Sequence, residues 1–134
     1  MKAFVAIAAA LLVAGCGAYQ FPGTSPSSTS SGMVHGTVLS VPCAPVERVD
    51  SPCAGRSVAG LNISYVRDGN VAGRAVTDSG GRYTVELAPG TYTVKLDTYM
   101  RVVSGPPTVT IAGGSDVEAD YILDNGIRVP VPQD

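Results

Sequence analysis

The sequence predicts an all-β fold: a seven-stranded antiparallel β-sandwich that follows a signal peptide and a flexible linker. From Val34 onward, apolar and polar residues alternate with a period of two, as in strands with one buried face. Turn-forming residues recur about every eight to twelve positions, the spacing typical of sandwiches and barrels. No segment after residue 33 has the periodicity of an amphipathic helix. A hydrophobic content of 45% is enough for a core.

The alternating segments and the turns between them define the expected strands. Their ranges are 34–41, 60–67, 70–77, 82–87, 91–97, 108–112 and 117–124. The alternation is clearest in 82–87, where Tyr83, Val85 and Leu87 share one face, and in 91–97. Between strands, Asp68-Gly69 favours a type I′ turn, residues 78–81 a turn built around Asp78, and Pro89-Gly90 a type II turn.

The amino terminus is typical of a lipoprotein precursor. One positive charge at Lys2 precedes twelve apolar residues, too few to span a bilayer but the length of a signal-peptide core. The run ends in Val-Ala-Gly before Cys16, which resembles a bacterial lipobox. We therefore expect residues 1–15 to be removed and Cys16 to carry a diacylglycerol group, usually with a further acyl chain such as palmitate. An ordinary secretory signal with an incidental cysteine is the alternative.

A lipidated Cys16 places the protein in the cell envelope, facing outside the cytoplasm. Two or more acyl chains bind a membrane stably, whereas one binds marginally. Gly17 stands where an aspartate would favour retention in the inner membrane, so we expect the outer membrane or cell surface. The partner predicted from this segment is the membrane itself, reached through the lipid.

Two segments flank the expected domain at residues 34–124. Residues 16–33 are rich in serine, threonine, proline and glycine, a composition that predicts a flexible linker. The tail, residues 125–134, contains Pro130 and Pro132. It is expected either to extend along an edge strand or to remain loose.

The two remaining cysteines, Cys43 and Cys53, lie in one long loop between the first two expected strands. Because Cys16 is assigned to lipid and the compartment is oxidising, we expect a Cys43–Cys53 disulfide. A redox or metal pair would require closer spacing or neighbouring histidines, and the sequence has neither. This loop is also where a partner surface is expected, because strand geometry does not account for it.

Several short motifs carry a resemblance to a known family. They are VHGTV at 34–38, VAGL at 58–61, TDSGGRY at 77–83 and LAPGTY at 87–92. Together they resemble the carboxypeptidase regulatory-like domain over about residues 33–124. The resemblance implies a transthyretin-like, immunoglobulin-like sandwich and an accessory rather than a catalytic role. The zinc ligands of the related peptidases have no counterpart in this chain.

Residues that could carry catalysis are scarce. His35 is the only histidine and should face outward from the first strand, and no serine lies in a GxSxG pattern. Asp116, Glu118 and Asp120 should share one strand face, where they could attract Ca²⁺ but more simply solvate an edge. We therefore expect no enzyme activity, no cofactor and no metal.

The remaining expectation concerns binding. Nine basic and eleven acidic residues are scattered without runs, which gives no footprint for nucleic acid. Tyr99, beside Met100 in the expected 98–107 loop, is the one aromatic residue of the expected domain that is not assigned to the core, and the two are a possible binding surface. The sequence thus favours a binding or structural module whose partner is an envelope protein or a glycan. A carbohydrate-binding accessory module is the alternative.

Overall fold

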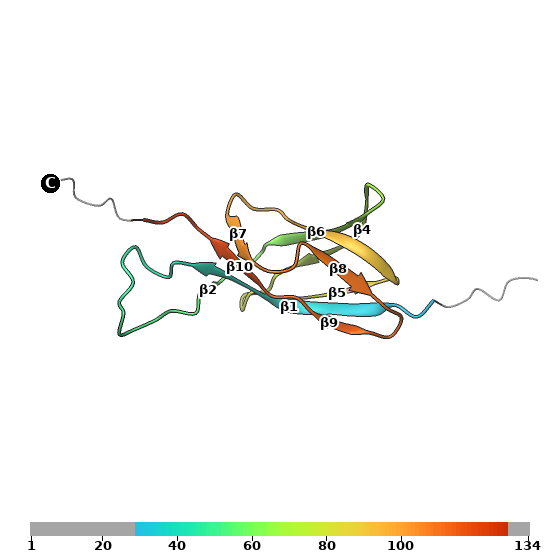
Figure 1. The fold of residues 1–134 in the computed structure, drawn as a ribbon, viewed down its shortest axis with the longest axis horizontal. Helices are drawn as coiled ribbons and strands as arrows, with labels where there is room; N and C mark the ends of the chain where they lie inside the picture. The colour runs from blue at the N-terminus through green and yellow to red at the C-terminus, as the bar shows by residue number, and fades with distance from the viewer. Residues whose placement is uncertain (1–28, 129–134) are drawn as a thin grey trace, which may run out of the picture.

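The computed structural model describes residues 29–128, which form two packed β-sheets (Figure 1). The signal peptide, Cys16 and most of the predicted linker lie outside the described residues, as does the tail from residue 129. No helix in the described part is long and apolar enough to cross a membrane. The strands are β1 (Gly32–Val41), β2 (Arg56–Ser57), β3 (Asn62–Arg67), β4 (Asn70–Val76), β5 (Arg82–Leu87), β6 (Gly90–Leu96), β7 (Arg101–Ser104), β8 (Thr108–Ile111), β9 (Asp116–Glu118) and β10 (Tyr121–Asp124).

Strand β1 is the centre of the larger sheet, and its two halves have different neighbours. Its first half pairs antiparallel with β5 and parallel with β9. Its second half pairs antiparallel with β2 and parallel with β10, and β10 in turn pairs with β7. The sheet is therefore mixed, and the prediction of purely antiparallel sheets was wrong. The alternation in a sequence indicates which face of a strand is buried but not which direction its neighbour runs.

The two halves of β1 meet at Gly36, where β9 ends and β10 has not begun. A Cβ atom at Gly36 would lie 2.0 Å from the carbonyl oxygen of Ala119, so only glycine fits. The amide of Ala119 donates to the His35 carbonyl, and the Asp120 carboxylate accepts from the Thr37 amide at 2.7 Å. One predicted strand, 117–124, is thus two strands with a side-chain hydrogen bond at the break.

The smaller sheet has the order β4-β3-β6-β8 and is antiparallel throughout. Its inner face packs on the larger sheet, and the predicted alternation of buried residues is confirmed in β3, β5 and β6. The core is built mainly of aliphatic residues and four tyrosines. The largest side chains with almost no exposed surface are Tyr65, Tyr92, Tyr121, Ile63 and Leu123.

Several strand ends differ from the predicted ranges. β1 begins at Gly32, two residues before the predicted strand, because Gly32 and Met33 pair with Leu87 and Glu86. β3 begins at Asn62, since the amide of Leu61 donates to the buried Thr77 hydroxyl instead of joining a ladder. The two strands absent from the prediction are β2 and β7, which are short and exposed on both faces. Exposure on both faces leaves no alternation to read.

The predicted turns are mostly confirmed. Asp68 and Gly69 have φ values of 51° and 76°, the two positive values that a type I′ turn requires. Asp78 accepts the amides of Gly80 and Arg82 at 2.8 and 2.9 Å, as expected. The type II turn at Pro89-Gly90 was wrong. Gly90 has a φ of 151°, which is positive but far from the value of about 80° that a type II turn requires, and it is already the first residue of β6.

The buried tyrosines differ in how their hydroxyl groups are satisfied. Tyr92, Tyr83 and Tyr121 each donate to a backbone carbonyl, of Ala88, Ala119 and Pro106 respectively. The Tyr65 hydroxyl is buried and has no partner in hydrogen-bonding geometry within the described residues. It nevertheless lies close enough to Tyr83 to help raise the pKa of the Tyr83 phenol. Burial raises the pKa of Tyr65, Tyr83 and Tyr121, so these phenols stay neutral.

This difference predicts opposite outcomes for two matched substitutions. Tyr92→Phe removes a formed hydrogen bond and leaves the Ala88 carbonyl unsatisfied, so it should lower the free energy of unfolding by about 1 kcal/mol. Tyr65→Phe removes a buried hydroxyl with no partner and should be neutral or stabilising. Urea unfolding of both variants at equal pH measures the difference. A larger loss in Tyr65→Phe than in Tyr92→Phe would contradict this description of the core.

Candidate functional site

The candidate site lies at the end of the sandwich where β1 finishes. The β1–β2 loop, the end of β10 and the described C-terminal residues meet at this end, opposite the start of β1 (Figure 1). The loop carries the Cys43–Cys53 disulfide, which confirms the predicted pairing. Closing a loop of this length stabilises a domain by about 3 kcal/mol in the chain-entropy model. The bridge thus restrains a loop whose side chains are otherwise in water.

This end carries apolar side chains that the core does not use. Val49, in the disulfide loop, is fully exposed, and Val46 is 69% exposed. Val103 of β7 and Ile127 beyond β10 are each about half exposed. Exposed apolar side chains gathered at one place indicate an interaction surface more strongly than isolated ones do.

A groove of about 490 Å³ lies at this end, and we call it the loop-end groove. Its apolar lining consists of aliphatic and proline side chains: Val41, Pro42, Pro45, Val103 and Ile127. Its charged lining consists of Glu47, Arg101, Asp124 and Arg128. Among residues 29–128, no aromatic side chain lines the groove.

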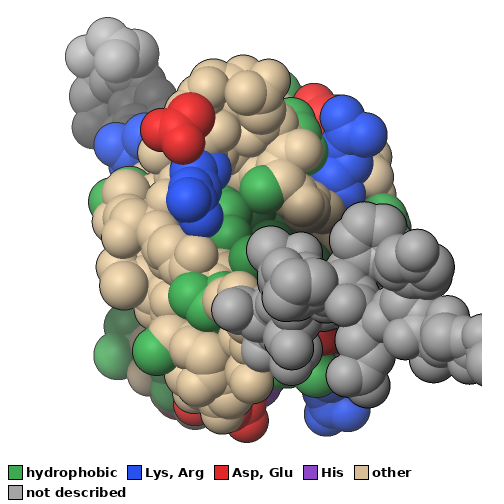
Figure 2. All heavy atoms as spheres, turned by 90° about the vertical axis from the view of Figure 1, so that its right-hand side faces the viewer, with side chains coloured by type: hydrophobic (Ala, Val, Ile, Leu, Met, Phe, Trp, Pro, Cys, Tyr) green, Lys and Arg blue, Asp and Glu red, His purple; other side chains and the backbone are tan. Residues whose placement is uncertain are grey.

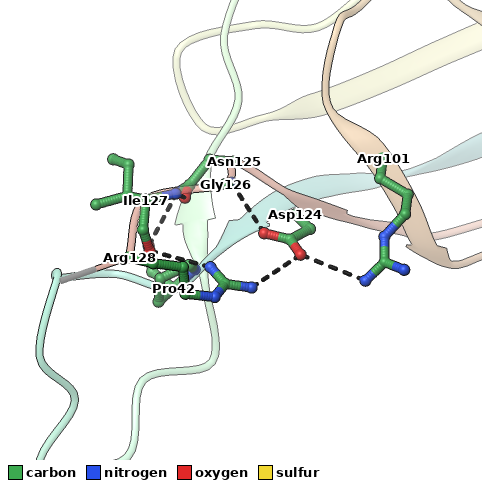
Figure 3. A network of polar contacts seen from close by, with 7 residues as sticks. All are labelled: Pro42, Arg101, Asp124, Asn125, Gly126, Ile127 and Arg128. Carbon is green, nitrogen blue, oxygen red and sulfur yellow. Dashed lines mark hydrogen bonds and ion pairs between the residues drawn. The ribbon is translucent and has the colours of Figure 1, made fainter. Parts of the chain in front are cut away.

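Asp124 organises the charged wall, as Figure 3 shows. Its carboxylate lies between two guanidinium groups and accepts from Arg128 at 2.9 Å and from Arg101 at 3.4 Å, both at Oδ2. The other oxygen accepts the Gly126 amide at 2.9 Å. That backbone hydrogen bond, followed by the one from Arg128, holds the pKa of Asp124 below its usual range. The carboxylate is thus ionised near neutral pH.

Backbone pairing brings these charged residues together. Asp124 is the last residue of β10 and pairs with Val41 on one side and Arg101 on the other. The chain beyond it is held by Asn125, whose amide donates to the Val41 carbonyl and whose side chain donates to that of Pro42, both at 2.9 Å. The predicted tail therefore begins along β1, and Arg128 is directed back to Asp124.

A β-bulge directs Val103 into the groove. Ser104 pairs with Ile122 and Val102 pairs with Leu123, so Val103 is an extra residue on β7. Bulges at sheet edges reorient a side chain away from regular pairing and are common beside binding sites. Here the reoriented side chain joins the apolar lining.

The two residues predicted as a binding surface differ in how far their side chains are exposed. Tyr99 is 92% exposed, in agreement with its exclusion from the core. Met100 is half-buried and packs against the core. Neither residue lines the loop-end groove.

The other candidate residues lie away from this groove. His35 is half-exposed and its Nδ1 lies 2.8 Å from Asp116, beside a smaller hollow of about 260 Å³. Asp120 is engaged by the Thr37 amide, and Asp116, Glu118 and Asp120 are exposed. Within residues 29–128, no three His, Cys, Asp or Glu side chains are grouped closely enough to hold a metal ion.

The comparison with known proteins gives no relative from which residue roles could be transferred. No protein-family model and no curated protein matches the chain. The site must therefore be judged on its own geometry. Arg101, Asp124 and Arg128 were not predicted as site residues, because nothing in their spacing shows that β7 and β10 are neighbours.

The lowered pKa of Asp124 predicts an acid-dependent loss of stability. A carboxyl group with a folded-state pKa below its unfolded value stabilises the fold above about pH 4 and loses that contribution as pH falls through the folded pKa. Asp124→Asn should therefore lower the melting temperature near pH 7, and this deficit should shrink below about pH 4. Thermal unfolding of both proteins from pH 7 to pH 2 tests it. A deficit that is constant across this range would exclude the ionised carboxylate as its source.

Proposed function

We propose that this protein is a lipid-anchored, non-enzymatic binding module of the cell envelope that faces outside the cytoplasm. In this proposal residues 1–15 are a cleaved signal peptide and Cys16 carries the lipid. The sandwich is then a carboxypeptidase regulatory-like domain that presents its loop end to a partner. The partner is an envelope protein or a glycan.

One observation carries the proposal: the described chain enters the sandwich at the end opposite the loop-end groove (Figure 1). β1 begins at Gly32 and has ten residues, so it extends about 30 Å before reaching the groove at Val41. A lipid at Cys16 would be joined to the domain from the entry side, through the predicted linker. The groove and the disulfide loop would then lie at the end of the domain opposite the point of attachment.

The surface at the entry end is consistent with that orientation. Figure 2 views this end, where hydrophobic, basic and acidic side chains are scattered among the backbone and the other side chains of the described residues. Such a surface has no concentrated patch of one charge. The exposed apolar residues of the loop end are Val46, Val49, Val103 and Ile127, whereas Met33, which is 40% exposed, belongs to the entry end.

A carbohydrate-binding accessory module is supported by one residue, the exposed Tyr99. Sugars usually stack on exposed aromatic rings, and the remaining described tyrosines, Tyr65, Tyr83, Tyr92 and Tyr121, are buried. The described lining of the loop-end groove also contains no aromatic side chain. Binding of a protein is therefore the better supported form of the proposal.

The lipid anchor is tested by metabolic labelling with radioactive palmitate in a bacterial host. The wild-type protein should be labelled and should sediment with membranes, whereas Cys16→Ala should lose both properties because it lacks the acceptor thiol. The matched control is the double variant Cys43→Ala/Cys53→Ala, which removes the other two cysteines without leaving an unpaired thiol and should keep the label. Equal labelling of wild type and Cys16→Ala would contradict the proposal that Cys16 carries the lipid.

A further inference from the structure

We propose that the loop-end groove binds the free carboxyl terminus of a partner protein whose last residue is apolar. This inference rests on the proposed function, because it takes the groove to face away from the membrane. The groove has one charged wall and one apolar wall, and together they indicate the chemistry of the partner.

The arginines of the charged wall have N–H donors that make no hydrogen bond within the described residues. A guanidinium group has five N–H donors in a planar fork that matches a carboxylate. Within the described residues, Arg101 uses one donor, at 3.4 Å to Asp124, and its side chain is 78% exposed. Arg128 contacts the same Asp124 oxygen and is 60% exposed, whereas Asp124 itself is 12% exposed. An arriving ligand therefore meets guanidinium groups rather than the carboxylate that holds them.

The charge balance of the groove favours an anion on that side. Within the described residues, Arg101 and Arg128 form ion pairs only with Asp124, so guanidinium groups outnumber carboxylates at the Arg101–Arg128 wall, although Glu47 balances the charge of the whole lining. Glu47, the other acidic residue of the lining, belongs to the disulfide loop and accepts the Cys43 amide at 3.2 Å. It would orient a ligand so that its carboxylate points toward Arg101.

The apolar wall selects what accompanies the carboxylate. Val41, Pro42, Pro45, Val103 and Ile127 give the groove an aliphatic lining with room for one or two residues in its 490 Å³. In an extended peptide, neighbouring side chains point to opposite faces, so an internal acidic residue and its apolar neighbour would not both enter. A C-terminal valine or leucine carries both groups on one residue.

The lining argues against the other carriers of a carboxylate. An acidic sugar would be expected to stack on an aromatic ring, and the part of the chain that the structure describes places none in the groove. A fatty acid would need a long enclosed apolar channel, whereas this groove is open and has five apolar residues. A protein terminus fits both its length and its chemistry.

The test is an NMR titration of the full-length ¹⁵N-labelled protein in micelles with acetyl-valyl-valine. The expected result is a saturable shift of the Arg101, Val103, Asp124 and Ile127 amide signals, with no saturable shift from the peptide with an amidated C-terminus. Arg101→Gln should weaken binding about tenfold or more, because a charge-assisted bidentate contact is lost. Val103→Asp should weaken it as well, through loss of apolar contact and repulsion of the carboxylate.

The matched control is Arg74→Gln, an exposed arginine of β4 in the other sheet, which should bind like wild type. Equal shifts with the acid and the amide, or none with either, would overturn the inference. Tighter binding of a galacturonic acid oligomer than of the dipeptide would overturn it in favour of an acidic glycan. Titration in micelles does not depend on acylation. Failed palmitate labelling with intact peptide binding would therefore refute the anchor alone, and the reverse result would refute this inference alone.

Discussion

The close approach of β1 to the β9–β10 junction is the constraint on which the larger sheet depends. Gly36 packs directly against the Ala119 carbonyl oxygen, and a Cβ atom at Gly36 would clash with this oxygen. The same carbonyl accepts the Tyr83 hydroxyl, and the neighbouring Asp120 accepts the Thr37 amide. This contact lets β1 pair with β5 and β9 over one half and with β2 and β10 over the other. One long strand thereby connects both ends of the domain.

The position of the loop-end groove follows from that arrangement. Because β10 runs parallel to the second half of β1, Asp124 reaches the same end as Val41. β7 pairs with β10 on its other side and brings Arg101 to the carboxylate. The disulfide then restrains the loop that contributes Pro45 and Glu47. Charge and apolar surface meet at the end of the domain opposite the start of β1.

Sequence reasoning predicted the parts of this fold that depend on local pattern. The alternation in β5 and β6 indicated their buried faces. Asp68-Gly69 indicated the turn between β3 and β4, and Asp78 indicated the turn between β4 and β5. The cysteine pair followed from compartment and count. The parallel pairing of β1 and the break at Ala119 depend on contacts between residues more than eighty positions apart, which no local pattern records. The groove was missed for the same reason, since Arg101 and Asp124 become neighbours only through β7 and β10. Tyr99 was recognised as exposed because it broke the core pattern, whereas Met100 shares its loop but packs inward.

The central proposal is that the groove faces away from the membrane to which Cys16 is proposed to attach. Paramagnetic relaxation of the lipidated protein in nanodiscs containing a gadolinium-chelating lipid tests it most directly, because the broadening of each amide signal falls steeply with distance from the lipid surface. The account predicts stronger broadening at Gly32 and Met33, where β1 begins, than at Val49, Val103 and Ile127. Stronger broadening at the loop-end residues would contradict it.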